Sequence, residues 1–206
     1  MQSRQKWVSS VIVVTIATLF VSACAHTTLT AVWKDDAYTG GPLKKILVMA
    51  ALKNPANRRI VESALVNELK QNGVEGIASY SSMESKELSP ENVMAAAKEN
   101  QANGLMAVRL VGVDEQTVYH VPAYSVPYPY YYSWGTYYPH MHEYTGMPGY
   151  TATYKYYNVE TNIYATDTEK LVWSAASQTV DPQNINKEAN IFARKIVKSL
   201  GSSGLL

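Results

Sequence analysis

The sequence predicts a single α/β or α+β domain built on a mixed sheet of about five strands. Three observations predict this class. Between residues 44 and 113, apolar runs of strand length alternate with two segments that begin with helix-capping signals. Between residues 154 and 180, two apolar segments flank a short polar turn. An amphipathic helix follows near the end of the chain, so the expected order is βαβαβ, a long tyrosine-rich loop, then ββα.

An export signal precedes this domain. Two basic residues, Arg4 and Lys6, are followed by a mostly apolar run, Val11 to Val21, and by Ser22-Ala23 directly before Cys24. A charged segment, a short apolar segment and a small-residue cleavage site are typical of a signal peptide. The alternative is a transmembrane helix, but the apolar run is shorter than the roughly 20 residues that a span requires.

The segment Val21-Ser22-Ala23-Cys24 resembles the lipobox of bacterial lipoproteins, with Val21 where leucine is commoner. The resemblance implies cleavage before Cys24 and lipidation of its thiol by diacylglycerol, with an amide-linked acyl chain such as palmitate. Several acyl chains anchor a protein stably, at roughly 0.8 kcal/mol per buried methylene. Ala25, rather than Asp, follows Cys24, which by similarity to Gram-negative lipoproteins implies the outer membrane, with the domain facing the periplasm.

Processing leaves about 183 of the 206 residues, enough for one domain with a sizeable core. Loss of Arg4 and Lys6 leaves 16 basic and 17 acidic residues. The mature chain therefore has no excess of basic residues that would indicate nucleic-acid binding. Because Cys24 is the only cysteine, no disulfide can form within the chain. We expect a signal peptide over residues 1–23, a lipidated tether over 24–43 and a globular domain over 44–201.

The first half of the domain reads as βαβαβ. The tether contains a candidate edge strand around Leu29 to Trp33. The apolar run Lys44 to Leu52 predicts a strand buried on both faces. Capping and proline signals then predict two helices, one from Asn54-Pro55 to Asn72-Gly73 and one from Ser89-Pro90 to Asn103-Gly104. On the first helix, the periodicity leaves Arg58 and Glu62 for solvent. Further strands are expected over Val74 to Tyr80 and Leu105 to Val113.

The second half predicts a hairpin and a helix. Tyr154 to Ala165 and Lys170 to Val180 flank a polar turn and are expected to pair antiparallel. The last helix is expected from Ile185 to Leu200, with Gly201 ending it.

A tyrosine- and proline-rich insertion, residues 122–150, separates the two halves. It holds nine of the 16 tyrosines and five of the nine prolines. Prolines exclude a continuous helix or central strand there, and so long a loop is usually functional or disordered. It is either an extended arm whose tyrosines pack on one another, a recognition surface for protein or glycan, or a membrane-contacting segment. The candidate binding residues are Tyr128, Tyr130, Tyr131, Tyr132, Trp134, Tyr137 and Tyr138.

Catalytic and metal signatures are weak. His140 and His142, with Glu143 or His120, form the only constellation that resembles a metal site. The insertion offers them no fixed scaffold, so we expect no metal and no other cofactor. Arg109 stands alone on an apolar strand, where such a residue either sits in a cleft or, more commonly, pairs with a nearby carboxylate, and we draw no conclusion from it. The sequence has no phosphate-binding glycine loop and no common hydrolase motif, which favours a protein without catalytic activity.

The run ILVMAALKNPANRRIVESALVNELKQNGVEG and the hairpin TNIYATDTEKLVWSA resemble small bacterial envelope lipoproteins of unknown function. The order of elements is similar to the amino-terminal domain of the Tol-system translocation protein (TolB). It is also similar to outer-membrane lipoprotein activators of peptidoglycan synthases. The resemblance implies a partner-binding module without catalytic residues, and the tyrosine-rich insertion is this chain's departure from it.

These observations predict a non-catalytic binding or scaffolding module, anchored to the outer membrane, whose partner is an envelope protein or a cell-wall polymer such as peptidoglycan. An envelope hydrolase with dispersed catalytic residues is the competing hypothesis.

Overall fold

The computed structural model describes residues 27–83, 89–120, 133–138 and 149–206. Within them a six-stranded mixed sheet has the order β1-β6-β5-β4-β2-β3. The fold class is confirmed, with one strand more than the five expected, because the edge strand expected near Leu29 to Trp33 is present as β1. The elements are β1 (Thr27–Lys34), β2 (Lys45–Ala51), α2 (Pro55–Gln71), β3 (Glu75–Ala78), α3 (Ser79–Ser82), α4 (Pro90–Glu99), β4 (Gly104–His120), α5 (Trp134–Tyr137), β5 (Tyr150–Ala165), β6 (Leu171–Val180) and α6 (Ile185–Ser202).

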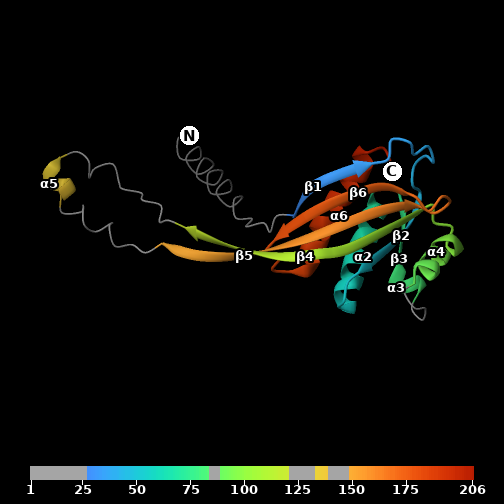
Figure 1. Cartoon of the computed structure of the whole chain (residues 1–206), viewed down its shortest axis with the longest axis horizontal. Coiled ribbons are helices and arrows are strands. Elements are labelled where there is room, and N and C mark those ends of the chain that lie inside the picture. The colour runs from blue at the N-terminus through green and yellow to red at the C-terminus, as the bar shows by residue number, and fades with distance from the viewer. Residues whose placement is uncertain (1–26, 84–88, 121–132, 139–148) are drawn as a thin grey trace, which may run out of the picture.

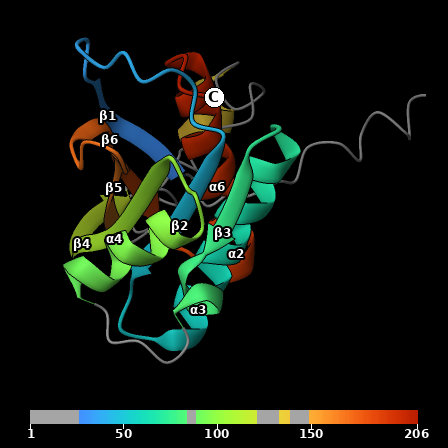
Figure 2. The ribbon, with the colours of Figure 1, turned by 90° about the vertical axis from the view of Figure 1, so that its right-hand side faces the viewer.

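The parallel half of the sheet places β2 between β3 and β4. Ile46, Val48 and Ala50 pack into the larger core, which also contains side chains of α2 and α6. Leu47 points to the opposite face and packs in a smaller core with residues of α4. Figure 2 shows α4 on the other side of the sheet from α2 and α6. The prediction that β2 is buried on both faces is therefore confirmed.

The predicted helix starts are confirmed by their capping bonds. Asn54 Oδ1 accepts hydrogen bonds from the N–H groups of Ala56 and Asn57 at the start of α2. Ser89 Oγ accepts one from the N–H of Asn92 at the start of α4. These side chains satisfy backbone donors that the first helical turn leaves unpaired.

Three expectations in this half are wrong. The helix expected from Ser89-Pro90 to Asn103-Gly104 is α4, which ends earlier, at Glu99, and Gln101 behind it has a left-handed backbone with φ 57°. Glu62 does not face solvent but is fully buried, because donors from β2, α2 and α3 converge on its carboxylate. The strand expected over Val74 to Tyr80 is β3, which ends at Ala78. The chain then turns into α3 because Ser79 Oγ and the N–H of Tyr80 both bind Glu62.

The antiparallel half contains β4, β5, β6 and β1. The hairpin of β5 and β6 is confirmed, and its turn holds Glu169 at φ 58°. The helix α6 covers the inner face of these strands with Phe192, Ile196 and Leu200. The sequence predicted that Gly201 would end α6, but the helix continues to Ser202. The chain reverses at Gly204, at φ 68°, which lets the N–H of Leu205 bond to the carbonyl of Leu200.

The strands β4 and β5 are longer than the sequence predicts. β4 runs to His120 instead of Val113, and β5 begins at Tyr150 instead of Tyr154. They pair from Gly104↔Ala165 to His120↔Tyr150 with a register shift between Leu110 and Gly112, whereas β6 pairs with β5 only from Tyr156 onward. Residues 115–120 and 150–155 therefore form a two-stranded ribbon that extends beyond the sheet (Figure 1).

Candidate functional site

The ribbon is held in register by pairs of side chains across its two strands. Glu115 forms an ion pair with Lys155 at 3.2 Å, and the hydroxyls of Thr117 and Thr153 are 3.0 Å apart. Cross-strand pairs of this kind are the unit of sheet stabilisation. They matter here because a two-stranded hairpin is at best marginally stable in water.

Aromatic side chains cluster at the tip of the ribbon. The ring of His120 stacks on Tyr150, with centroids 4.9 Å apart, and its Nε2 lies 3.1 Å from the hydroxyl of Tyr154. Tyr119, on the opposite face, is 60 % exposed, and Tyr150 is 64 % exposed. The tip thus presents broad aromatic surfaces that the core does not use.

The predicted binding residues are described only in part. Trp134 and Tyr138 are both exposed, with ring centroids 5.2 Å apart. Tyr137 lies in the short helix α5. Four of the tyrosines lie outside the described residues: Tyr128, Tyr130, Tyr131 and Tyr132. Cys24 lies outside them as well, so its lipidation stays a prediction.

The metal hypothesis is centred on residues that the structure does not describe, since His140, His142 and Glu143 lie in the range 139–148. His120 is the one candidate ligand with a described position, and it contacts tyrosines. In the described part of the chain, no three residues among His, Cys, Asp and Glu are grouped to hold a metal ion. Over the same residues, no helix has the length and apolar character to cross a membrane.

Arg109 pairs with a carboxylate, the commoner of the two arrangements that the sequence left open. Its Nη2 donates to Glu160 Oε2 at 2.9 Å, directly across the β4–β5 ladder. This hydrogen bond lowers the pKa of Glu160 and raises the pKa of Arg109 from their ordinary values. Both side chains are partly exposed to solvent, and the pair helps to hold β4 and β5 in register.

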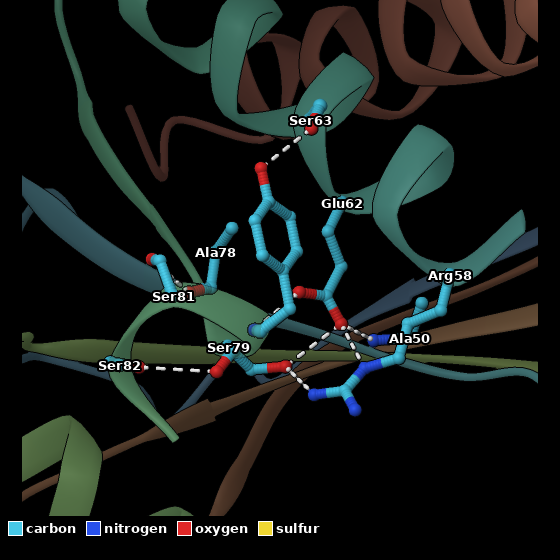
Figure 3. Close-up of polar contacts among 9 residues, drawn as sticks. Ala50, Arg58, Glu62, Ser63, Ala78, Ser79, Ser81 and Ser82 are labelled. Carbon is cyan, nitrogen blue, oxygen red and sulfur yellow. Dashed lines mark hydrogen bonds and ion pairs between the residues drawn. The ribbon is translucent and has the colours of Figure 1, made fainter. Parts of the chain in front are cut away.

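A buried polar network joins the ends of β2 and β3 to α2 (Figure 3). Glu62 Oε1 accepts from the N–H of Ala50 at 3.0 Å, Arg58 Nε at 2.9 Å and Ser79 Oγ at 2.8 Å. Its Oε2 accepts from the N–H of Tyr80 at 3.0 Å. Arg58 Nη2 in turn donates to Ser79 Oγ at 2.7 Å. With four donors and no exposed surface, this carboxylate is a structural brace and is closed to ligands.

A cavity of about 300 Å³ lies where the ribbon joins the body of the domain. Its walls come from β4, β5 and β6 on one side and from α2 and α6 on the other, and they are mostly apolar. Sequence reasoning missed this site. One signal was available: Glu188 falls on the apolar stripe of α6, three residues after Ile185 and four before Phe192.

Comparison with known proteins places the chain in no family. No protein-family model and no curated protein sequence matches it. Among solved structures, it is similar to a PelC dodecamer from Paraburkholderia phytofirmans at 14 % identity, with 85 % of this chain and 97 % of that chain covered and a TM-score of 0.47. It is also similar to lipoprotein GNA1162 from Neisseria meningitidis at 7 % identity, covering 77 % of this chain and 98 % of that chain, with a TM-score of 0.42. At these values neither likeness carries weight for function, and the expected resemblance to the Tol-system protein or to synthase activators is not shown.

Proposed function

We propose that this chain is a lipid-anchored, non-catalytic binding module of the bacterial envelope, with its contact surface on the β4–β5 ribbon and the segment that the ribbon carries. The observation that carries the proposal is the ribbon itself. Two strands continue past the sheet for residues 115–120 and 150–155, where they bury no core. They expose aromatic side chains instead, and exposed aromatic clusters are typical of protein-interaction surfaces.

The contacts of His120 support binding over hydrolysis. An envelope hydrolase with dispersed residues would need this histidine beside a nucleophile such as a serine. His120 instead stacks on Tyr150 and bonds to Tyr154, which are also ribbon residues. These contacts stabilise the aromatic surface of the ribbon.

The anchor is proposed from the lipobox-like segment that ends at Cys24. Lipidation there would hold the domain at the outer membrane, and an envelope protein or peptidoglycan would be the partner within reach. A Cys24→Ser variant is expected to accumulate as uncleaved precursor, measured by mass spectrometry of the membrane fraction. Normal cleavage of that variant would contradict the anchor.

The contact surface is tested by crosslinking in intact cells, followed by purification of the full chain. The double variant Trp134→Ala, Tyr138→Ala is expected to lose most of the crosslinked partner, because truncating aromatic anchors typically costs 2 kcal/mol or more each. The matched control is Trp33→Ala, which removes a tryptophan that is 50 % exposed on β1, away from the ribbon. Capture at the wild-type level by both variants would remove the segment that the ribbon carries from the contact surface.

A further inference from the structure

The cavity at the root of the ribbon has an apolar wall and one buried charge. Its described lining is Leu52, Asn57, Val61, Val108, Leu110, Tyr157, Val159, Thr179, Pro182, Ile185, Glu188, Ala189 and Phe192. Glu188 is the only ionisable carboxyl group among these residues, and the set contains neither lysine nor arginine. The volume, about 300 Å³, is at the small end for ligand pockets.

Glu188 lines this cavity and carries an unsatisfied oxygen. The residue is only 5 % exposed, and its Oε2 has no hydrogen-bond partner among the described residues. Its backbone is fixed in the first turn of α6, where its N–H bonds to the carbonyl of Asn184. The dipole of α6 favours a negative charge at this end of the helix. A dipole does not replace a donor, however, and a buried acceptor without one is costly.

A second buried oxygen without a partner lies on the same side of the sheet. Thr161 is fully buried, and its Oγ1 also has no hydrogen-bond partner in the described part of the chain. It pairs across the ladder with Val108, which lines the cavity. The Glu188 carboxylate oxygen can only accept a hydrogen bond, whereas the Thr161 hydroxyl can donate or accept one, so the unmet need for a donor beneath α6 comes from Glu188.

The mouth of the cavity is apolar and partly exposed. Leu110 on β4 and Ile185 on α6 are 40 % and 39 % exposed, and both line it. Val113, 43 % exposed, lies three residues farther along β4 towards the ribbon. An apolar rim around a buried carboxylate matches a ligand with an apolar body and a single cationic donor group.

We propose that this cavity binds a lysine side chain of the partner polypeptide, with the ammonium group donating to Glu188 and the aliphatic stem against Val108, Val159 and Phe192. The proposal rests on the proposed function for its partner, while the chemistry of the cavity stands on its own. Lysine fits better than arginine, because a compact ammonium on a four-carbon stem matches a small cavity with few acceptors. A guanidinium carries five N–H donors, which this lining would leave largely unpaired.

The cavity is tested on the purified mature chain with n-hexylammonium, using n-hexanol as the neutral analogue of the same length. Binding is followed by shifts of the backbone amide signals of Val108 and Ala189 in two-dimensional NMR. The wild type is expected to bind hexylammonium at least tenfold more tightly than hexanol. The variant Glu188→Gln is expected to lose that preference. Equal binding of the two probes by the wild type would overturn the proposal.

Two further variants guard against a folding artefact. Glu91→Gln removes a carboxylate from the first turn of α4, on the other side of the sheet, and is expected to keep the tenfold preference. Leu110→Trp fills the mouth at a half-exposed position and is expected to weaken both probes. A Glu91→Gln variant that loses the preference, or a Leu110→Trp variant that binds both probes as the wild type does, would contradict the assigned cavity.

The source of the cation is settled by competition. The capped tripeptide Leu-Lys-Leu is expected to displace hexylammonium, whereas Leu-Met-Leu at the same concentration is not. Displacement by phosphatidylethanolamine vesicles but not by the lysine peptide would make the occupant a lipid headgroup and overturn the peptide assignment. These readouts do not depend on Trp134 or Tyr138. Failure of the proposed contact surface would be detected by the crosslinking experiment and not by this one.

Discussion

Replacing Glu62 with glutamine is expected to destabilise the domain far more than a surface change of the same kind. Both oxygens of the Glu62 carboxylate accept hydrogen bonds in a site with no exposed surface. The glutamine amide keeps one oxygen acceptor and turns the other position into a donor. Its best orientation keeps the oxygen toward Ala50, Arg58 and Ser79, so that the new NH2 group faces the N–H of Tyr80.

The magnitude follows from those contacts. Leaving the N–H of Tyr80 without an acceptor costs about 1–3 kcal/mol, and replacing a charged hydrogen bond to Arg58 with a neutral one costs about 1 kcal/mol more. The free energy of unfolding should fall by about 2–4 kcal/mol. For a domain of this size, that lowers Tm by roughly 5–15 °C.

The assay is thermal and urea unfolding of the mature chain, followed by circular dichroism. The matched control is Glu68→Gln, on the same helix, where Oε1 is 3.5 Å from Asn72 Nδ2 and the change should stay within about 0.5 kcal/mol. A double-mutant cycle with Arg58→Gln should show coupling of at least about 0.5 kcal/mol. A Glu62→Gln variant with the same Tm as Glu68→Gln and the wild type would refute the conclusion that this network stabilises the fold.

The remaining predictions concern the two halves of the sheet and the ribbon. Gly76→Ala should lower the free energy of unfolding by about 1–3 kcal/mol in urea, because the new Cβ would lie 2.9 Å from Val66 Cα on α2. The control Gly112→Ala should not lower it, because no atom lies within 4 Å of that Cβ. Equal effects of the two variants would contradict this packing. Because the folded pKa of Glu160 lies below the ordinary 4.5, its pairing stabilises the fold above that pH and the benefit disappears as the pH falls through the folded pKa. The Tm difference between wild type and Glu160→Gln should therefore shrink from pH 7 to pH 3, and a difference that grows on acidification would be inconsistent with it. Replacing residues 121–149 with Asn-Gly should leave Tm close to wild type, because His120 and Tyr150 are directly paired and can be joined by a two-residue turn; loss of folding would show that the segment belongs to the core.

The sequence predicted the elements whose causes are local. A capping side chain acts on N–H groups two or three residues away, as Asn54 and Ser89 do, so the helix starts could be read directly. The burial of β2 on both faces followed from a continuous apolar run. Composition likewise pointed to the tyrosine-rich insertion as a distinctive segment, and the strands on its two sides pair as neighbours.

Only the tertiary structure decided where the charged residues lie and how far the strands extend. Glu62 has the periodicity of an exposed position, yet it is buried because Ala50 and Tyr80, 12 and 18 residues away, bring donors to it. The ribbon continues past Val113 because β4 and β5 satisfy each other's backbone groups beyond the end of β6. The Glu188 cavity requires five elements to meet around one side chain. Contacts between residues distant in sequence depend on how the elements pack, and periodicity within a single element does not contain that information.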